Sequence, residues 1–142
     1  MEDFFGFTLS ILVAKIRALG NEKYRARQLF RWIYNLGNLD FHEMTNIPKG
    51  LRTVFSEMLS LELMPISGEY PSTDGSVKLA FTAGDGEVIE SVIMPEKNRA
   101  TLCISTQIGC RMGCKFCVTG KIGFRRNLST GEIVGQVMTV RE

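Results

Sequence analysis

Three of the four cysteines in this chain lie within eight residues, in the segment CRMGCKFC. Spacings of four and three residues allow Cys110, Cys114 and Cys117 to converge on one centre without help from distant parts of the fold. Gly109 and Gly113 permit the positive φ angles that such a wrapping loop requires. The segment therefore predicts a metal centre, because idle thiols at this spacing seldom arise by chance.

The number of protein ligands distinguishes a structural zinc site from an iron–sulfur cluster. Structural zinc takes four protein ligands, usually as two separated pairs, whereas a cubane iron–sulfur cluster held by three cysteines leaves one iron open to a substrate or cofactor. Cys103 is a candidate fourth ligand, but it falls within a predicted strand while the other three share a loop. We therefore rank an iron–sulfur cluster on Cys110, Cys114 and Cys117 first and a zinc site second.

Composition places the chain among soluble globular proteins. It has 142 residues, 44% hydrophobic and 23% charged, which is enough for one or two small domains with a true core. The acidic start, Met1-Glu2-Asp3, lacks the positive charge of a secretory signal, and no uninterrupted apolar run approaches the roughly 18 residues of a spanning helix. We expect a cytoplasmic protein without a membrane partner, in which thiols stay reduced.

Positive charge gathers around the cysteines, although the net charge is only +2. Seven basic residues lie between Pro95 and Arg126, against the single acid Glu96. They are Lys97, Arg99, Arg111, Lys115, Lys121, Arg125 and Arg126. The cluster fits either a phosphate-bearing ligand or a solvated basic face, and charge alone does not separate the two.

Residues 1–62 are predicted to form a small helical domain. Apolar stripes indicate amphipathic helices over about residues 8–19, 24–37 and 48–59, and three such helices make a small bundle. The second carries a cationic face of Lys23, Arg25, Arg27 and Arg31. Such a face either docks on nucleic acid or only keeps the helix soluble.

Residues 63–100 are predicted to form a β-meander. Asp74-Gly75 and Gly84-Asp85-Gly86 are turn signals, and Val77, Leu79 and Phe81 alternate as in a half-buried strand. In the next strand, residues 87–94, Glu90 falls within an apolar row. A carboxylate there usually lies at an edge with access to water, whereas an enclosed one becomes a candidate proton acceptor because desolvation favours its protonation.

Residues 101–142 are predicted to begin another domain. A strand over residues 101–107 leads into the cysteine loop, and Ser129 with Glu132 fits a capping box that opens a helix. Strand, loop and helix form one βα unit, whose strand needs parallel neighbours. The helix would leave a face of Ile133 and Val137 uncovered. The fold class predicted for the whole chain is therefore α+β.

The pattern C-x-x-x-C-x-x-C with Phe116 before the last cysteine resembles the radical S-adenosylmethionine superfamily. That resemblance implies a [4Fe-4S] cluster on Cys110, Cys114 and Cys117 and S-adenosylmethionine bound at the open iron, with Phe116 beside the cofactor. It also implies a reducing electron donor, because the cofactor is cleaved reductively.

The flanking segments TLCISTQIGC (101–110) and GFRRNL (123–128) resemble the RlmN/Cfr family of RNA adenine methyltransferases. Upstream, YRARQ (24–28), WIY (32–34) and FHEMTN (41–46) resemble that family's N-terminal RNA-binding domain. The resemblance implies methylation of carbon 2 of adenine in large-subunit rRNA and in tRNA, through a methyl group carried on a C-terminal cysteine.

Two further site residues follow from the same resemblance. Glu90 matches the family's proposed proton acceptor. Cys103 matches the second reactive cysteine, which resolves the protein–RNA adduct by a transient disulfide. The residues alone favour a different interpretation of Cys103, since a lone cysteine in a strand is usually a small buried hydrophobe.

Family members are more than twice as long as this chain, in which only 25 residues follow Cys117. The methyl-carrying cysteine and most of the barrel are absent, so we expect the chain alone to be catalytically incomplete. It would hold the RNA-binding domain, the meander and the first βα unit of a truncated radical-SAM α/β barrel, unless a partner chain completes the barrel. The alternative is a zinc-stabilised RNA-binding module without catalysis, and the oligomeric state stays open.

Overall fold

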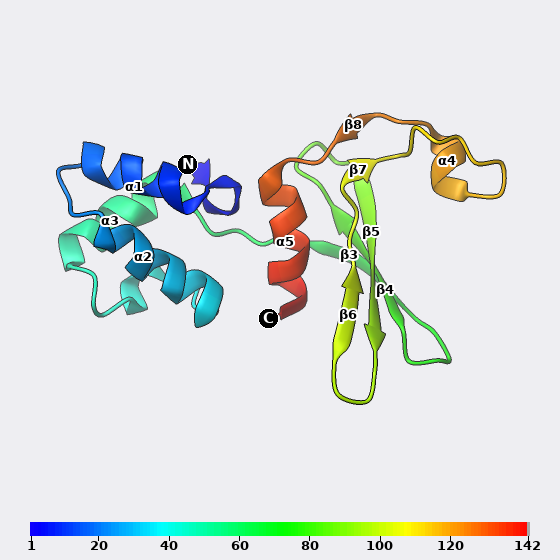
Figure 1. Ribbon diagram of the computed structural model, residues 1–142, viewed down its shortest axis with the longest axis horizontal. Coiled ribbons are helices and arrows are strands. Elements are labelled where there is room, and N and C mark those ends of the chain that lie inside the picture. Colours follow the sequence, from blue (N-terminus) through cyan, green and yellow to red (C-terminus); the bar gives the residue numbers. More distant parts are fainter. Residues whose placement is uncertain (142) are drawn as a thin grey trace. The chain divides into compact units, whose positions relative to one another are not determined.

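The computed structural model describes residues 1–141, which divide into two compact units, Met1–Glu62 with Arg141, and Leu63–Val140. Helices predominate in the first unit and an antiparallel sheet in the second (Figure 1). The predicted mixture of helix and sheet is therefore confirmed. Within residues 1–141, none of the helices combines the length and the apolar character needed to cross a membrane.

The first unit contains the three predicted helices. They are α1 (Leu9–Ala18), α2 (Tyr24–Phe30) and α3 (Lys49–Met58). Thr8 begins α1, because its hydroxyl accepts a hydrogen bond from the backbone N–H of Ile11. The second helix continues as a π-helical turn, Arg31–Asn35, which the apolar pattern did not predict. Two 3-10 turns, Phe4–Gly6 and Phe41–Glu43, and a short parallel pair of β1 (Glu2–Asp3) and β2 (Leu59–Ser60) complete the unit.

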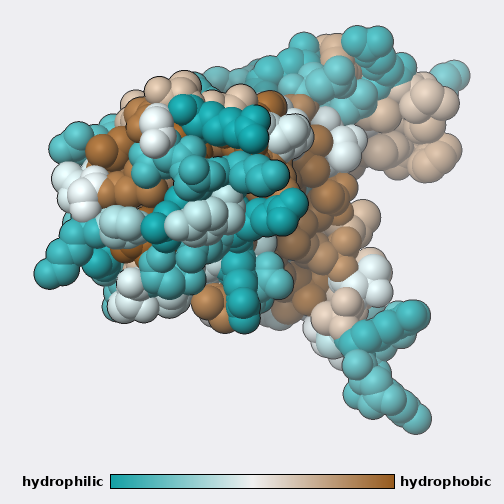
Figure 2. All heavy atoms as spheres, turned by 60° about the vertical axis from the view of Figure 1, so that its left-hand side comes forward, coloured by the Kyte–Doolittle hydropathy of each residue, from teal (hydrophilic) through white to brown (hydrophobic). Residues whose placement is uncertain are grey.

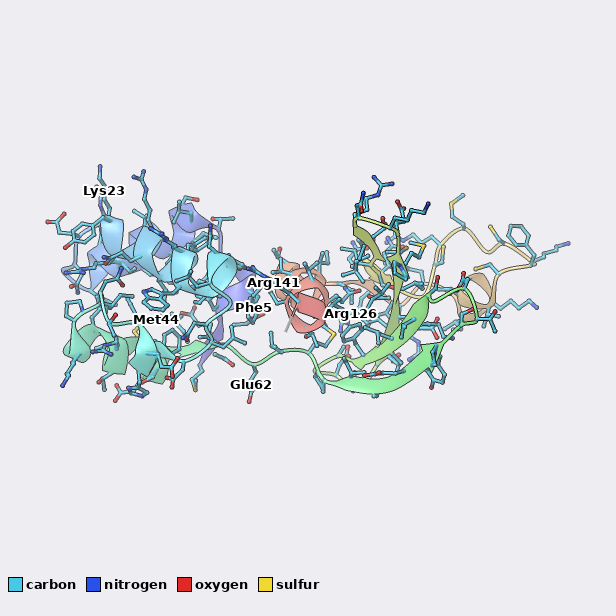
Figure 3. All side chains as sticks on the ribbon, turned by 90° about the horizontal axis from the view of Figure 1, so that it is seen from below. Phe5, Lys23, Met44, Glu62, Arg126 and Arg141 are labelled. Atoms are coloured by element: carbon cyan, nitrogen blue, oxygen red, sulfur yellow. The ribbon has the colours of Figure 1, made fainter. Side chains whose placement is uncertain are left out.

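The core of this unit combines helical side chains with residues from the connections. Leu12 and Ile16 from α1 and Leu29 from α2 are fully buried, as their stripes predicted. Met44 and Ile47 lie outside the three helices and are equally buried, and Figure 3 shows Met44 directed into the space between the helices. The segment after Asp40 therefore belongs to the core rather than to a solvated loop.

The second unit is built on a four-stranded meander. Its strands are β3 (Ile66–Pro71), β4 (Val77–Thr82), β5 (Val88–Pro95) and β6 (Ala100–Cys103), paired antiparallel in that order. Gly75 and Gly86 adopt φ of 86° and 83° in the first two turns, a conformation that suits glycine. The predicted meander and both glycine turns are confirmed.

One face of this sheet packs against helix α5 (Thr130–Arg141). Ser129 and Glu132 form the predicted capping box, with Ser129 N–H donating to Glu132 Oε2 at 2.7 Å and Glu132 N–H donating to Ser129 Oγ at 3.2 Å. Ile133 packs on the buried cluster of Leu79, Phe81, Ile89, Ile108 and Leu128. The expectation of an uncovered face was therefore wrong for Ile133, whereas Val137 is 44% exposed.

The single strand predicted over residues 101–107 is wrong. β6 ends at Cys103, residues 104–106 leave the sheet, and β7 (Gln107–Ile108) pairs antiparallel with β8 (Arg126–Asn127). β6 itself pairs antiparallel with β5, and Cys103 lies opposite Val92. Among the described residues of the second unit, β6 therefore lacks the parallel neighbours that we expected. The sheet also continues across residue 100, where the sequence suggested a boundary.

A buried glutamine explains why the strand breaks. Gln136 on α5 accepts the backbone N–H of Ser105 at 2.9 Å and donates its amide to the Ser105 carbonyl at 2.9 Å. The side chain thus satisfies the two backbone groups that a neighbouring strand would otherwise satisfy. The hydroxyl of Ser91, 1% exposed, donates to the same Gln136 oxygen at 2.7 Å. One side chain therefore joins α5, β5 and the segment between β6 and β7.

Replacing Gln136 with leucine should destabilise the chain by about 2 kcal/mol or more, because it leaves the Ser105 backbone and the Ser91 hydroxyl without their partner. Urea unfolding followed by circular dichroism measures this change. Val137→Ala on the same helix is the control and should stay within about 0.5 kcal/mol, since that side chain is exposed. Equal unfolding free energies for Gln136→Leu and wild type would contradict the role of this amide.

Candidate metal centre and adjoining sheet face

The three clustered cysteines occupy the connection between β7 and the short helix α4 (Val118–Ile122). Cys110, Cys114 and Cys117 are each partly exposed, and none is in a disulfide. Residues 109–117 contain no Asp, Glu or His that would compete for a metal. The donor set of this loop is therefore thiol sulfur alone, which suits iron–sulfur clusters and zinc.

Glycine backbones give this loop its shape. Gly109 and Gly113 adopt φ of 71° and 61°, which confirms the positive angles predicted for both. A Cβ on Gly109 would lie 1.6 Å from the carbonyl oxygen of Gly123, so the two ends of the loop approach closely only because residue 109 lacks a side chain. Gly120 is similarly close to Cys114, whose backbone nitrogen would lie 2.9 Å from an added Cβ.

Backbone amides favour the thiolate of the last cysteine. The pKa of Cys117 is lowered, mainly by the hydrogen bond from the backbone N–H of Gly120, which outweighs the opposing effect of desolvation; hydrogen bonds from Thr119 add smaller effects in the same direction as Gly120. The N–H of Met112 points at Cys110 Sγ at 3.4 Å. Because the thiolate is the metal-binding form, both contacts prepare the loop for a metal.

The donor chemistry fits a metal, whereas the thiols are not yet gathered around one. Within residues 1–141, no three Cys, His, Asp or Glu side chains are grouped so that they hold a metal ion. Cys103 lies in β6, outside the loop that carries the other three cysteines. The arrangement is that of three free thiols on one exposed loop whose ends are fixed.

Ion pairs anchor the exit of the loop. Arg126 contacts Asp85 at 2.7 Å and forms two hydrogen bonds of 2.8 Å to the carboxylate of Glu132; Figure 3 labels Arg126 near α5. The guanidinium of Arg126, with help from Ser129, lowers the pKa of Glu132 to about 2. Arg125 pairs with Glu87. The exit is thereby tied both to the turn between β4 and β5 and to the start of α5.

These pairs reduce the positive charge that the sequence suggested around the cysteines. Arg99 pairs with Glu96, and the acids that pair with Arg125 and Arg126 come from outside the basic segment. Arg111 lies over the ring of Phe124, 3.9 Å from its centroid. Arg111, Lys97, Lys115 and Lys121 take part in no ion pair within residues 1–141, so they carry the remaining positive charge.

The outer face of the sheet carries the other two predicted site residues. Glu90 is exposed and pairs with Lys78, with 2.9 Å between Oε1 and Nζ. This matches the water-accessible carboxylate that the residues alone favoured. Cys103 lies opposite Val92, which shares the face of Glu90, and its side chain is exposed. The interpretation of Cys103 as a buried hydrophobe is therefore wrong.

A cavity of about 620 Å³ adjoins this face. Its polar lining consists of Lys78, Glu87, Glu90, Ser105, Gln107, Thr119 and Arg125, and Gly109 and Val118 from the ends of the cysteine loop also reach it. Phe116 does not line the cavity. It is 92% exposed and lies near Met112 in sequence, which is 79% exposed. The structure thus brings Glu90 and the ends of the cysteine loop to one hollow, but not Phe116.

Sequence reasoning missed Lys78, Ser105 and Gln136. Gln136 had a signal, because it stands three residues after Ile133 and four before Val140 on the packed side of the helix. Lys78 alternates in β4 with the partly buried Val77 and the buried Leu79, which places it on the open face, but its pairing with Glu90 depends on register. Ser105 had no signal, since its role follows from the break in the strand.

A solved structure has the same fold. The crystal structure of a radical SAM methyltransferase from Sphaerobacter thermophilus superimposes with a TM-score of 0.84 at 39% identity, over 98% of this chain and 41% of that chain. The fold of this chain is thus similar to that of part of a radical SAM methyltransferase.

The sequence comparisons are more specific. The family described as "Ribosomal RNA large subunit methyltransferase N-terminal domain" matches residues 2–61. Proteins named "Dual-specificity RNA methyltransferase RlmN" from Bdellovibrio bacteriovorus and Syntrophus aciditrophicus are 43% and 48% identical over 99% and 86% of this chain. The chain is therefore similar to the N-terminal portion of RlmN proteins, and its residues 2–61 match the N-terminal domain of that family. It spans 35% of the length of each of these two relatives.

Two alanine substitutions test the glycine geometry of the loop. Both Gly109→Ala and Gly113→Ala force a left-handed residue, at a cost of about 1–2 kcal/mol. Only Gly109→Ala also drives a Cβ into the Gly123 carbonyl, whereas nothing lies within 4 Å at Gly113. Urea unfolding should therefore show the larger loss for Gly109→Ala, together with shifted amide signals at Gly123. Equal losses for the two variants would refute the close approach.

Proposed function

We propose that this chain supplies the RNA-binding and cluster-binding portion of a radical S-adenosylmethionine enzyme that methylates carbon 2 of adenine in large-subunit rRNA and tRNA. The observation that carries the proposal is the placement of three free thiols in one glycine-shaped loop whose ends are fixed to the sheet. The RlmN relatives support the substrate class. Because the chain spans 35–41% of its relatives' length, methylation requires residues beyond those present here.

Cys110, Cys114 and Cys117 would hold a [4Fe-4S] cluster as thiolates. When bound, such a cluster supplies the electron that cleaves S-adenosylmethionine reductively, so a reducing partner is also needed. The lowered pKa of Cys117 favours the ligating form, and the absence of carboxylates from the loop leaves thiolate sulfur as its donor, which suits such a cluster. Phe116, with its ring exposed, is available to contact the cofactor. Reduced thiols of this kind suit the cytoplasm.

Glu90 and Cys103 would act on the RNA side of the site. The carboxylate of Glu90 lines the cavity beside the loop and would accept the proton that leaves the adenine carbon. The Cys103 thiol, exposed on the same face, would attack the sulfur of a second cysteine that carries the RNA adduct. The S–S bond would form as the bond between that sulfur and the adduct carbon breaks, and this carbon would keep the electron pair and take up a proton to become the methyl group of the product. Neither role needs burial, because both groups must reach a large substrate.

We also propose a division of the chain into domains. Residues 1–62 would form the RNA-binding domain, residues 63–100 the meander, and residues 101–142 the start of the radical-SAM barrel, whose first strand takes parallel partners only when further strands are present.

Anaerobic reconstitution with iron and sulfide tests the metal site. Wild-type chain should bind about four irons and turn brown, and Cys114→Ala should lose the iron because two thiolates do not hold a cubane. Cys103→Ala is the matched control, an exposed thiol outside the loop, and should keep its iron. Measured zinc without iron, or loss of metal in Cys103→Ala, would favour the four-ligand zinc module instead.

Three exposed basic residues form the candidate RNA-binding surface of the helical unit. Lys23, Arg27 and Arg31 follow one another at four-residue spacing, are all exposed, and join no ion pair within residues 1–141. Figure 3 shows Lys23 directed away from the helices, and the face of the helical unit turned forward in Figure 2 is largely hydrophilic. These three residues form the basic ridge of α2.

If the basic ridge contacts phosphates, affinity for an rRNA or tRNA fragment falls linearly with the logarithm of salt concentration. The double variant Arg27→Gln/Arg31→Gln should weaken binding and reduce the slope by about 1–2, the charge of two contacts. Arg99→Gln, which removes a residue paired with Glu96 in the other unit, is the control. A slope that the double variant leaves unchanged would assign RNA contact to another surface.

A further inference from the structure

Lys78 occupies the centre of the outer face of the sheet. In β4, which lies between β3 and β5 in the sheet, it stands opposite Val92 of β5 and Tyr70 of β3, so its side chain has a neighbour on each side. Its Nζ lies 2.9 Å from Glu90 Oε1 and 5.0 Å from the centroid of the Tyr70 ring. The ammonium is therefore held between a carboxylate and an aromatic face.

The Tyr70 ring lies over a glycine of its own strand. A Cβ on Gly68 would lie 2.8 Å from the Tyr70 hydroxyl oxygen, so the ring extends along its own strand over a residue without a side chain. The register of β3 is irregular between Ile66 and Gly68, next to this contact. Tyr70 thus supports Lys78 on the side away from Glu90.

Glu90 is held from its backbone as well. The hydroxyl of Ser105 donates to the Glu90 carbonyl oxygen at 2.7 Å, and Ser105 is itself bound by Gln136. Lys78, Glu90 and Ser105 all line the 620 Å³ cavity, where Glu87 and Arg125 form a separate ion pair. Lys78 is the cation in the cavity wall that contacts the Glu90 carboxylate.

An exposed ion pair of this kind contributes little to folding stability, so stability does not account for the arrangement. Orientation does. A free glutamate side chain samples several rotamers, whereas a carboxylate bound to an anchored ammonium keeps one. When a ligand fills the cavity and displaces water, the charged carboxylate loses solvation, and the adjacent ammonium offsets that loss.

We propose that Lys78, supported by Tyr70, is a positioning residue that holds the Glu90 carboxylate at the cavity wall and balances its charge. This inference rests on the proposed function in one respect, which is the role of Glu90 as the proton acceptor. The contacts themselves belong to this chain and are measurable without iron, cofactor or RNA.

NMR of the isotope-labelled chain tests the contact from the lysine side. Glu90, by hydrogen bond and charge, raises the pKa of Lys78, with Tyr70 adding a smaller effect in the same direction. Glu90→Gln should lower the pKa of Lys78 toward its ordinary value, and Tyr70→Leu should lower it less. An unchanged Lys78 titration in Glu90→Gln would overturn the proposal.

The glutamate side is tested by its side-chain couplings. In wild type the Glu90 methylene couplings should report one rotamer, in Lys78→Met they should average, and in Lys78→Arg the single rotamer should return. Lys97→Met, which removes a lysine near the end of the sheet, is the control and should change nothing. Single-rotamer couplings that persist in Lys78→Met would overturn the proposal. If that variant unfolds, the Lys78 titration in Glu90→Gln decides.

Iron loading separates the two hypotheses. Lys78→Met should bind as much iron as wild type, because the lysine contacts none of the three cysteines. A wild-type chain that takes no iron would defeat the proposed function while leaving the coupling between Lys78 and Glu90 intact.

Discussion

The two hydrogen bonds between Gln136 and the backbone of Ser105 decide how the second unit is organised. After Cys103 the chain leaves the sheet, and its polar backbone must find other partners. The glutamine amide supplies both, and its oxygen also accepts the Ser91 hydroxyl from β5. Because Gln136 is fully buried, each of these bonds is made where water does not replace it. The exit from the sheet is therefore a fixed point rather than a loose connection.

The sheet face with Glu90 and the cysteine loop both depend on this fixed exit from the sheet. Ser105 carries the bond to the Glu90 carbonyl, and two residues later β7 begins the approach to the cysteine loop. At the far end of the loop, Arg126 joins Glu132 on the same helix that carries Gln136. Helix α5 thus holds the segments before and after the cysteines, while the face with Glu90 and Lys78 is set by strand register.

Local patterns were sufficient for most elements and failed where a side chain replaced a strand. The glycine turns of the meander, the capping box at Ser129 and the positive φ angles of Gly109 and Gly113 follow from local chemistry, and each was predicted. The strand over residues 101–107 was wrong because apolar alternation does not reveal a glutamine 31 residues away that binds Ser105. The pairing of Lys78 with Glu90 was missed for a related reason, since the alternation gives the face of a residue but not its cross-strand neighbour.

The contrast between the fixed ends of the cysteine loop and its open middle has a physical consequence for metal binding. Gly109 lies against Gly123, and Arg125 and Arg126 are ion-paired, so the closure of the loop is already present in the polypeptide. Between these points Met112 and Phe116 are exposed and the thiols are ungrouped. A bound metal would therefore have to order only the segment from Cys110 to Cys117, and the free energy of metal binding would be spent on that segment rather than on folding the unit. Because the two ends of the cysteine loop are already held together, bringing the three thiols to one metal does not have to include the entropic cost of closing the loop.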